Sequence, residues 1–439
     1  MPETKTVAAY TLGCKVNQYE TEAVLEQFLR NGYETVPFDS RADVYLVNTC
    51  TVTSLGDRKS RQMIRRTKHL NPEAVLVVMG CYSQTAPEEV QKIKEVDLIL
   101  GTSERGRVME LVNEFLNTSS RRSLVGDISA VAEFEELEIT HYENRTRAFL
   151  KVQDGCNQFC SYCIIPYARG RIRSRSVDSA VSEAENLVRC GFSEIVLVGI
   201  HLASYGKETG GKTSLADLLH KLSGIDGLKR IRLGSLEPTL FTEDFITKIK
   251  QLPKVCRHFH LSLQSGCDET LRRMNRKYTT REYASVVNNI RAAMPEAAIT
   301  TDIMVGFPQE SEEEFAATCR FVKEIQLAEA HIFKYSVRKG TRAAAMDGQV
   351  PPQVKEERSK QLAAITKKTA HTFLEQFLNQ ETEVLFEQHY KGQQEQFEGK
   401  TGNYITVVVQ SMENLEGRLL RVRLTGIDGT VMKGVLLPS

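Results

Sequence analysis

The stretch Cys156-Asn-Gln-Phe-Cys160-Ser-Tyr-Cys163 places three cysteines within eight residues, in the order C-x3-C-x2-C. Zinc sites and electron-transfer clusters are normally closed by four protein ligands, and this stretch offers no fourth ligand nearby. Three thiolates on a 4Fe-4S cluster leave one iron open to nitrogen or oxygen atoms of a substrate or cofactor. The alternatives are a partial zinc knuckle or three unrelated thiols, but closely spaced cysteines in a cytosolic chain usually indicate metal or redox chemistry.

A strand-like run at 148–152 ends just before this motif. Five similar runs follow, at residues 194–198, 229–233, 258–263, 299–305 and 331–336. Helical patterns separate them, for example at 179–190, 281–294 and 312–325. These six β/α units over residues 144–373 predict a partial TIM-type (β/α)6 barrel, in which the active site lies at the carboxyl ends of the strands. The cysteine motif follows the first strand, where such a barrel would place a cofactor.

Residues 1–117 also alternate between short apolar runs and helical patterns, which predicts an α/β domain with a parallel sheet and helices on both faces. The apolar runs lie at 7–12, 44–47, 75–79 and 98–100, and the helical patterns at 17–30, 54–69, 87–94 and 105–115. Three runs lead into a cysteine, namely Cys14, Cys50 and Cys81. Ligands bind beyond the carboxyl ends of strands in such a sheet, so we expect a second three-cysteine cluster there. A strand-end thiol taken alone is more often a packing residue.

The rest of the chain is expected to contain a linker and a small C-terminal domain. Residues 118–143 are polar and without periodicity, as in a linker. A charged helical stretch at 354–379 leads into the final domain, which we place at 374–439. This domain is predicted to be a small β-barrel, because strand-like runs alternate with glycine-rich turns. The runs lie at 383–386, 404–409 and 419–424.

The composition is typical of a folded cytoplasmic protein. A length of 439 residues suggests about three domains. The 57 basic and 56 acidic residues exclude a globally basic nucleic-acid coat, so any RNA contact must rest on local patches. No N-terminal apolar segment and no apolar run of about 18 residues occurs, so we expect no membrane contact. Four cysteines outside the two clusters are expected to be small buried residues, namely Cys190, Cys256, Cys267 and Cys319.

The whole chain resembles the radical S-adenosylmethionine (SAM) methylthiotransferases. Besides the cysteines, the resemblance rests on the motifs Gly234-Ser-Leu-Glu-Pro238, His260-Leu-Ser-Leu-Gln-Ser-Gly266, Thr301-Asp-Ile-Met-Val-Gly-Phe-Pro308 and Tyr335-Ser-Val-Arg-Lys-Gly-Thr341. It implies an N-terminal domain with an auxiliary cluster, a radical-SAM barrel and a C-terminal TRAM barrel. The opening Leu12-Gly-Cys-Lys-Val-Asn-Gln-Tyr-Glu-Thr21 is similar to the branch that acts on N6-threonylcarbamoyladenosine in tRNA. The alternatives are the branches for isopentenyladenosine tRNA or a ribosomal-protein aspartate, and a non-catalytic RNA-binding metalloprotein.

The resemblance also implies a reaction that uses SAM and two 4Fe-4S clusters. The cluster on the C-x3-C-x2-C motif would reduce SAM to methionine and a 5'-deoxyadenosyl radical, which would abstract hydrogen from C2 of the adenine. The auxiliary cluster on Cys14, Cys50 and Cys81 would carry the extra sulfide that a further SAM methylates. The product would be 2-methylthio-N6-threonylcarbamoyladenosine next to the anticodon. The implied partners are the tRNA anticodon stem-loop and an electron donor such as flavodoxin or ferredoxin.

Four residues at the strand ends or within the cysteine motif are expected to contact SAM, namely Tyr162, Gly199, Glu237 and Gln264. Tyr162 lies between the second and third cysteines, where the family has an aromatic residue near the adenine of SAM, and a core aromatic is the alternative. The chain departs from the family pattern at Gly199-Ile-His201, where many radical-SAM enzymes have two glycines and a glutamate. Backbone carbonyls are then the expected partners of the methionine amino group.

A threonylcarbamoyl group has a carboxylate that an isopentenyl group lacks, so its pocket needs a cation or strong donors. Lys15, next to Cys14, is a candidate for this role, and a solvated loop lysine is the alternative. Arg338 and Arg342 are rival candidates.

Two basic runs are candidates for contacts with the tRNA backbone. An extended segment beside the cysteine motif is expected to carry Arg169, Arg171, Arg173 and Arg175. One helical face carries Arg58, Arg61, Arg65 and Lys68. A solvated surface is the alternative for each run, and the place of the arginine run beside the proposed active site favours it over the helix. From His371 onward nine acidic residues oppose six basic ones, so RNA binding by the final domain must rest on a local face, which also keeps a protein substrate open.

Overall fold

The N-terminal part forms a parallel sheet of six strands in the computed structural model, which describes residues 4–139 and 146–438. In spatial order the strands are β2 (Glu34–Thr35), β1 (Thr6–Thr11), β3 (Val44–Thr49), β4 (Val75–Gly80), β5 (Leu98–Leu100) and β6 (Arg122–Leu124). Every residue of β3 and β4 is buried, as expected for central strands covered on both faces. The covering helices are α1 (Lys15–Arg30), α2 (Ser54–Leu70), α3 (Cys81–Thr85), α4 (Pro87–Gln91) and α5 (Val108–Thr118).

The predicted linker contributes to both neighbouring parts. Its start adds strand β6 to the sheet, and Leu137 and Ile139 join the hydrophobic core of the large barrel. Positions 140–143 of this linker lie outside the described residues.

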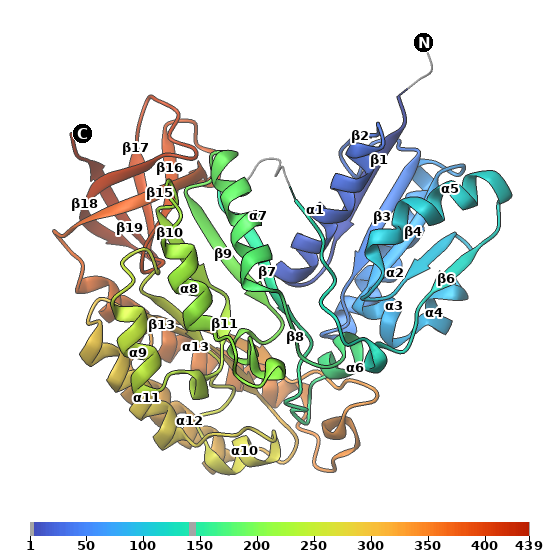
Figure 1. Ribbon diagram of the computed structural model, residues 1–439. Helices are drawn as coiled ribbons and strands as arrows, with labels where there is room; N and C mark the ends of the chain where they lie inside the picture. The colour runs from blue at the N-terminus through green and yellow to red at the C-terminus, as the bar shows by residue number, and fades with distance from the viewer. Residues whose placement is uncertain (1–3, 140–145, 439) are drawn as a thin grey trace.

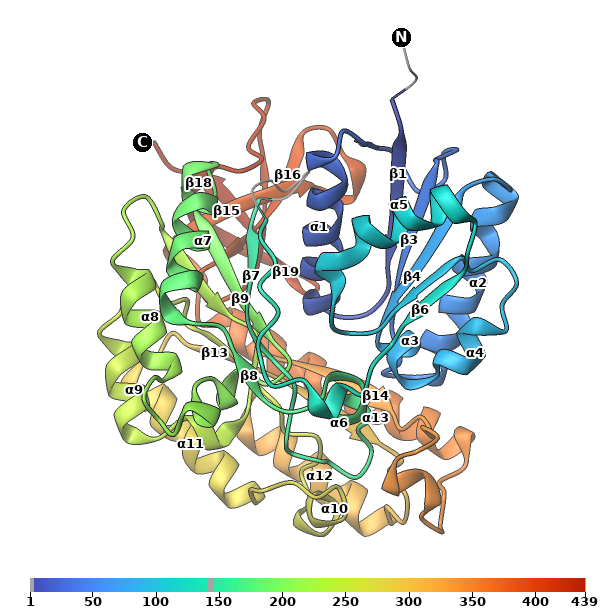
Figure 2. The same ribbon diagram turned by 45° about the vertical axis from the view of Figure 1, so that its right-hand side comes forward.

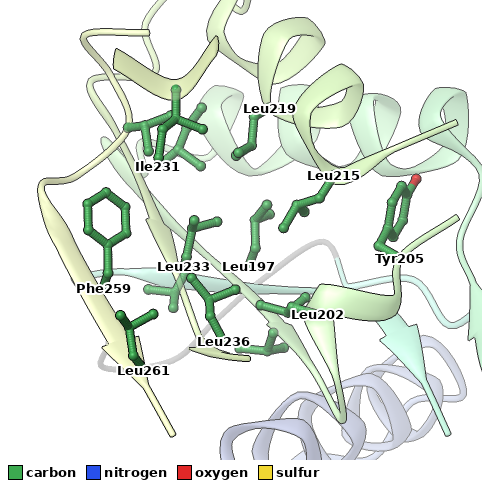
Figure 3. Packing of buried hydrophobic residues seen from close by; sticks show 14 of the residues in the cluster. Leu197, Leu202, Tyr205, Leu215, Leu219, Ile231, Leu233, Leu236, Phe259 and Leu261 are labelled. Carbon is green, nitrogen blue, oxygen red and sulfur yellow. The ribbon is translucent and has the colours of Figure 1, made fainter. Parts of the chain in front are cut away.

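The central part is the expected open β/α barrel, made of two four-stranded sheets. The six expected strands are β7 (Ala148–Asp154), β9 (Glu194–Gly199), β10 (Arg230–Leu233), β12 (His258–Leu261), β13 (Ala298–Val305) and β14 (Glu329–Lys334). Two short strands extend the sheets, β8 (Arg173–Ser174) and β11 (Ser235–Leu236). The helices are α6 (Ile165–Arg169), α7 (Val177–Arg189), α8 (Leu215–Ser223), α9 (Glu243–Lys250), α10 (Asp268–Arg273), α11 (Thr280–Ala293) and α12 (Glu312–Ile325). Figure 3 shows Leu197 and Leu233 of paired strands beneath Leu219 of α8.

The C-terminal part is a closed five-stranded barrel in the order β15-β16-β17-β19-β18. Its strands are β15 (Glu381–His389), β16 (Gln396–Thr401), β17 (Thr406–Gln410), β18 (Leu419–Asp428) and β19 (Val431–Leu436). Helix α13 (Pro352–Glu375) leads into it. The sequence predicted the barrel but not β16 or β19, each of which contains a glycine and a lysine.

The outer parts pack on the central barrel through two sets of contacts, and Figures 1 and 2 show α1 between the N-terminal sheet and that barrel. Helix α1 lies between the N-terminal sheet and the barrel, because Val24 and Phe28 enter the core of the sheet while Val16 and Tyr19 enter that of the barrel. The C-terminal barrel packs at the amino end of β10, where Arg230 donates hydrogen bonds to the carbonyls of Lys400 and Glu383. Within the described ranges, no helix combines the length and hydropathy needed to cross a bilayer.

Candidate active site

A cavity of about 530 Å³ lies where the carboxyl ends of β7, β9 and β10 face the start of α1. The three cysteines of the C-x3-C-x2-C motif line it together with Cys14. Gly155 turns the chain from β7 into the motif with φ +73, and a Cβ there would lie 1.8 Å from the carbonyl oxygen of Arg171. Ser161 anchors the motif from inside, since its hydroxyl donates to the carbonyl of Arg273 at 2.8 Å. The predicted cysteine triad is therefore held at the mouth of the barrel.

The three strand-end cysteines converge as the sequence predicted. Gly13 has φ +106, and a Cβ at this position would lie 3.1 Å from the sulfur of Cys50, so the loops of Cys14 and Cys50 are in contact. Asn17 joins the same loops, because its amide donates to the carbonyls of Leu12 (2.8 Å) and Thr49 (3.0 Å). The paired ends of β3 and β4, Thr49 and Gly80, bring Cys81 to the same edge.

The surroundings of Cys81 correct the predicted role of two arginines. Arg169 ends helix α6, is fully buried, and donates from Nε to the sulfur of Cys81 at 3.2 Å. Arg173 is buried as well and donates to the carbonyl of Arg169 at 2.9 Å. The two guanidinium groups have protein partners inside the fold, so the prediction that they contact tRNA is wrong. The expected extended conformation is present at Arg173, in β8, but not at Arg169, which is helical. Arg171 is exposed.

Arg169 belongs to a buried charge network between the N-terminal sheet and the barrel. Glu20 of α1 accepts hydrogen bonds from Arg169 and, at 2.7 Å, from Lys151 of β7. Arg105 lies 3.1 Å from the same carboxylate, and Lys151 also pairs with Asp154 at 2.6 Å. Burial alone would raise the pKa of Glu20, but the surrounding cations outweigh it and lower this pKa to about 2. Glu20 is therefore ionised within the interface.

Three of the four predicted SAM contacts line the cavity, namely Tyr162, Gly199 and Glu237. Gln264 is outside that lining and is bonded through its backbone to Asp302 and Met304 of β13. The ring of Tyr162 also meets that of Phe307 at 6.4 Å between centroids, so it belongs partly to the core.

Two cavity residues were not assigned a role from the sequence. Arg276 donates to the sulfur of Cys160 at 3.2 Å and to both oxygens of Glu237 at 2.7 and 2.8 Å. His201 presents Nε2 at 3.7 Å from Glu237, while its Nδ1 is 2.7 Å from the hydroxyl of Ser204. The Gly199-Ile-His201 departure signalled His201, but no spacing or motif signalled Arg276.

Of the candidate partners of the substrate carboxylate, Lys15 lies in the cavity and Arg338 does not. Lys15 lines the cavity and keeps solvent-accessible surface there, yet the protein around it removes water and lowers the pKa of its ammonium group. Arg338 is engaged elsewhere, with the carboxylate of Asp57 and the hydroxyl of Thr51, and it is not part of this cavity.

Two further expectations need correction. Of the four remaining cysteines only Cys256 is buried, whereas Cys190 is exposed and the other two are half-buried. On α2, Arg61 donates to the hydroxyl of Tyr82 and Lys68 to Asp97, so this helical face is partly tied to the protein.

Comparison with known proteins identifies the family. Residues 6–101 match the model described as uncharacterized protein family UPF0004, and residues 150–322 match that of the radical SAM superfamily. The threonylcarbamoyladenosine tRNA methylthiotransferase MtaB of Bacillus subtilis (strain 168) is 42% identical over 422 residues, which are 95% of this chain and 93% of that protein. The chain belongs to the radical-SAM methylthiotransferase family.

Other similar proteins support the same family assignment. The MtaB protein of Aquifex aeolicus is 40% identical and covers 95% of this chain and 99% of its own length. A tRNA-2-methylthio-N(6)-dimethylallyladenosine synthase of Methylacidiphilum infernorum is 34% identical, with 98% and 94% covered. The radical SAM methyltransferase TsrM from Kitasatospora setae shares the fold, with a TM-score of 0.59 at 16% identity over 78% of this chain and 77% of its own. The protein is therefore a transferase that uses SAM and 4Fe-4S clusters.

The residues of this methylthiotransferase fit those groups. Burial raises the pKa of Cys156 to about 11 and those of Cys81 and Cys163 to about 12, so a bound cation is needed to hold these sulfurs as thiolates. Arg169 and Arg276 each donate a hydrogen bond to one sulfur of a triad. The cavity volume lies in the range that accommodates a small cofactor.

Proposed function

We propose that this enzyme methylthiolates C2 of N6-threonylcarbamoyladenosine next to the anticodon of tRNA, in the cytoplasm. Two relatives named for this substrate are 42% and 40% identical over 95% of the chain, whereas a relative from Methylacidiphilum infernorum named for dimethylallyladenosine is 34% identical. The observation that carries the proposal is that Cys14 lines the same cavity as Cys156, Cys160 and Cys163. A single base in that cavity would meet both cysteine triads.

The residues are assigned separate tasks. Cys156, Cys160 and Cys163 would hold the cluster that binds SAM. A second set would hold the auxiliary cluster, namely Cys14, Cys50 and Cys81. When bound, these groups supply a carbon-centred radical that abstracts hydrogen and a transferable methylthio group. In domain terms, residues 1–117 would carry the auxiliary cluster, 118–143 the connection, 144–373 the radical-SAM core and 374–439 the TRAM barrel.

The residues of the protein bind and orient SAM and the tRNA. Arg276 ties the sulfur of Cys160 to Glu237, which fixes one side of the cavity. Tyr162 and Gly199 provide an aromatic face and an open backbone edge in the same cavity, where the adenine and methionine parts of SAM would lie. Among the predicted RNA contacts, Arg171 is the exposed member beside the motif and would contact the anticodon stem-loop. A small electron-transfer protein such as flavodoxin or ferredoxin would supply the electron.

The test is mass spectrometry of tRNA nucleosides from cells that lack this gene and from cells that regain it. We expect 2-methylthio-N6-threonylcarbamoyladenosine to disappear and its unmethylthiolated precursor to accumulate. Loss of the 2-methylthio derivative of isopentenyladenosine, or of a methylthiolated ribosomal-protein aspartate, would assign the enzyme to another branch.

A further inference from the structure

Lys15 lies on the wall of the active cavity, where its side chain is exposed. It begins α1 directly after Cys14, and its ammonium makes no hydrogen bond or ion pair with any residue of the described ranges. An ammonium that has lost part of its water and gained no partner is unfavourable, so such a position suits an anionic ligand.

Tyr404 of the C-terminal barrel lies at the opposite, amino end of the barrel strands. It follows β16 in a left-handed conformation with φ 71, and its ring stacks on His258 with centroids 4.4 Å apart and planes 10° apart. The ammonium of Lys400 lies 4.5 Å and the guanidinium of Arg232 4.8 Å from the centroid of the ring. Its hydroxyl has no hydrogen-bond partner among the residues that the structure describes. A non-glycine residue held at positive φ is strained, and such strain is common at functional sites.

Positive charge is in excess around this tyrosine. The cations come from all three parts of the chain: Lys15, Arg147, Arg232 and Lys400 act on Tyr404, and Arg230 lies 3.7 Å from Glu194. Two carboxylates balance them: Glu194 pairs with Arg232 at 2.6 Å, and Glu387 pairs with Arg147 at 2.9 Å. Electrostatic interactions connect Lys15 with Tyr404, Arg147, Arg232 and Glu194. We call these five cations and Tyr404 the junction cluster; one more anion would reduce its excess charge.

Strand β12 shows how the junction cluster relates to the cavity. His258, His260 and Ser262 occupy alternate positions, opposite in direction to Phe259 and Leu261 of the hydrophobic core, so they face the barrel interior. Ser262 lines the cavity, and His258 stacks on Tyr404. Four residues of strand span roughly 13 Å. One face of β12 therefore runs from Ser262 on the wall of the cysteine cavity to His258, which stacks on Tyr404.

The shape of the substrate matches this direction. C2 of the adenine must face the cysteines, and the substituent on N6 projects from the other side of N1. A threonylcarbamoyl group would thus point its carboxylate away from the cysteines, toward the barrel interior. We infer that Lys15 and Tyr404 form the subsite that receives this carboxylate, so the C-terminal barrel takes part in substrate selection as well as in RNA binding. This inference rests on the proposed function.

The experiment measures binding and kcat/KM of the cluster-loaded enzyme with anticodon stem-loop RNAs. The RNAs carry threonylcarbamoyladenosine, its carboxyl methyl ester, isopentenyladenosine or unmodified adenosine. For the first RNA we expect Lys15→Ala to lower affinity and kcat/KM by about tenfold or more, as for a lost charge-assisted hydrogen bond. Tyr404→Phe should have a smaller effect of the same kind, and Lys15→Arg should restore most of the affinity. Matched controls are Lys221→Ala on the exposed side of α8 and Tyr390→Phe in the turn that follows β15 of the C-terminal barrel.

The RNA series separates the possible sources of the anion. A loss confined to the free carboxylate supports the subsite. An equal loss with all four RNAs would show that Lys15 binds a backbone phosphate, and would overturn the inference. If wild-type enzyme prefers threonylcarbamoyladenosine but Lys15→Ala has the same affinity and kcat/KM for that RNA, the inference about Lys15 fails and the proposed function stands. If wild-type enzyme acts on isopentenyladenosine instead, the proposed function fails. Iron content and circular dichroism confirm that each variant is folded and loaded.

Discussion

The guanidinium of Arg169, from the central barrel, donates a hydrogen bond to the sulfur of Cys81, in the N-terminal domain, at 3.2 Å. The same side chain pairs with Glu20 and donates to Asn17 at 2.6 Å. One residue of the barrel is thus bonded both to a proposed ligand of the auxiliary cluster and to the helix that follows Cys14. The position of the auxiliary cluster and the docking of the two domains are physically linked.

Replacing Arg169 should change the auxiliary cluster selectively. Hydrogen bonds and positive charge near the sulfurs raise the reduction potential of an iron-sulfur cluster. We expect Arg169→Gln to lower the potential of the auxiliary cluster in an EPR-monitored redox titration and to leave that of the SAM-binding cluster unchanged. Arg169→Lys, which keeps the charge but loses the Nε donor, should fall between. Arg171→Gln, an exposed neighbour, is the control, and an unchanged potential in Arg169→Gln would contradict the predicted role.

Glu20 should stabilise the docked domains in a pH-dependent way. Removing one member of a buried ion pair typically costs about 3–5 kcal/mol, so Glu20→Gln should lower the free energy of unfolding by about this amount at neutral pH. The folded pKa of Glu20 is about 2, below its ordinary value. Its contribution is therefore present above the unfolded pKa of about 4.3 and is lost as pH falls toward 2.

Urea unfolding of wild type and Glu20→Gln across pH measures this contribution. The difference between the two proteins should shrink below pH about 4.3. Glu110→Gln, which removes an exposed partner of Arg107, is the control and should leave the free energy of unfolding nearly unchanged. A difference between wild type and Glu20→Gln that does not depend on pH would refute the assigned ionisation.

Gly80 should be required for the position of Cys81. It has φ +102, and a Cβ would lie 2.3 Å from Oδ1 of Asn48 and 2.6 Å from the carbonyl oxygen of Thr49. Gly80→Ala must therefore move the end of β4, and we expect it to lose iron equivalent to one cluster per chain. Gly32→Ala also has positive φ but has no atom within 4 Å of its Cβ, so it should keep its iron. Full iron content in Gly80→Ala would contradict this requirement.

The SAM-binding triad should be needed for every step. Cys160→Ala removes one of three ligands and leaves Arg276 without its sulfur acceptor. We expect no 5'-deoxyadenosine and no methylthiolated product from this variant under anaerobic, reducing conditions. Cys190→Ala, at an exposed cysteine outside both triads, should behave as wild type. SAM cleavage at the normal rate in a folded Cys160→Ala protein would overturn the assignment of the motif.

Local sequence signals predicted much of this architecture. Period and spacing indicated the β/α units, and strand ends that run into Cys14, Cys50 and Cys81 indicated a shared edge, because parallel strands place their carboxyl ends together. The same signals failed for Arg169. Alternating arginines are typical of an exposed strand. Glu20, the partner of Arg169, is 149 residues away in the chain, and only tertiary packing brings the two side chains together.

The features that the sequence did not predict also depend on tertiary packing. Strands β16 and β19 owe their pairing to barrel closure and have weak strand propensity of their own, and glycines fit there because Gly399 and Gly434 leave room for neighbouring strands. Arg276 follows helix α10 in an ordinary charged stretch, and its two partners, Cys160 and Glu237, come from separate loops. Tyr404 was predicted as a strand residue, and its place against His258 depends on how two domains dock.

The central claim is that two cysteine triads with separate tasks serve one base in one cavity. It is tested most directly by measuring 5'-deoxyadenosine and methylthiolated nucleoside in the same anaerobic reactions, with wild-type enzyme and Cys14→Ala on tRNA that carries threonylcarbamoyladenosine. The account predicts that Cys14→Ala still cleaves SAM, loses about one of its two 4Fe-4S clusters, and makes no methylthiolated product. Methylthiolated product from Cys14→Ala at the wild-type rate would contradict it.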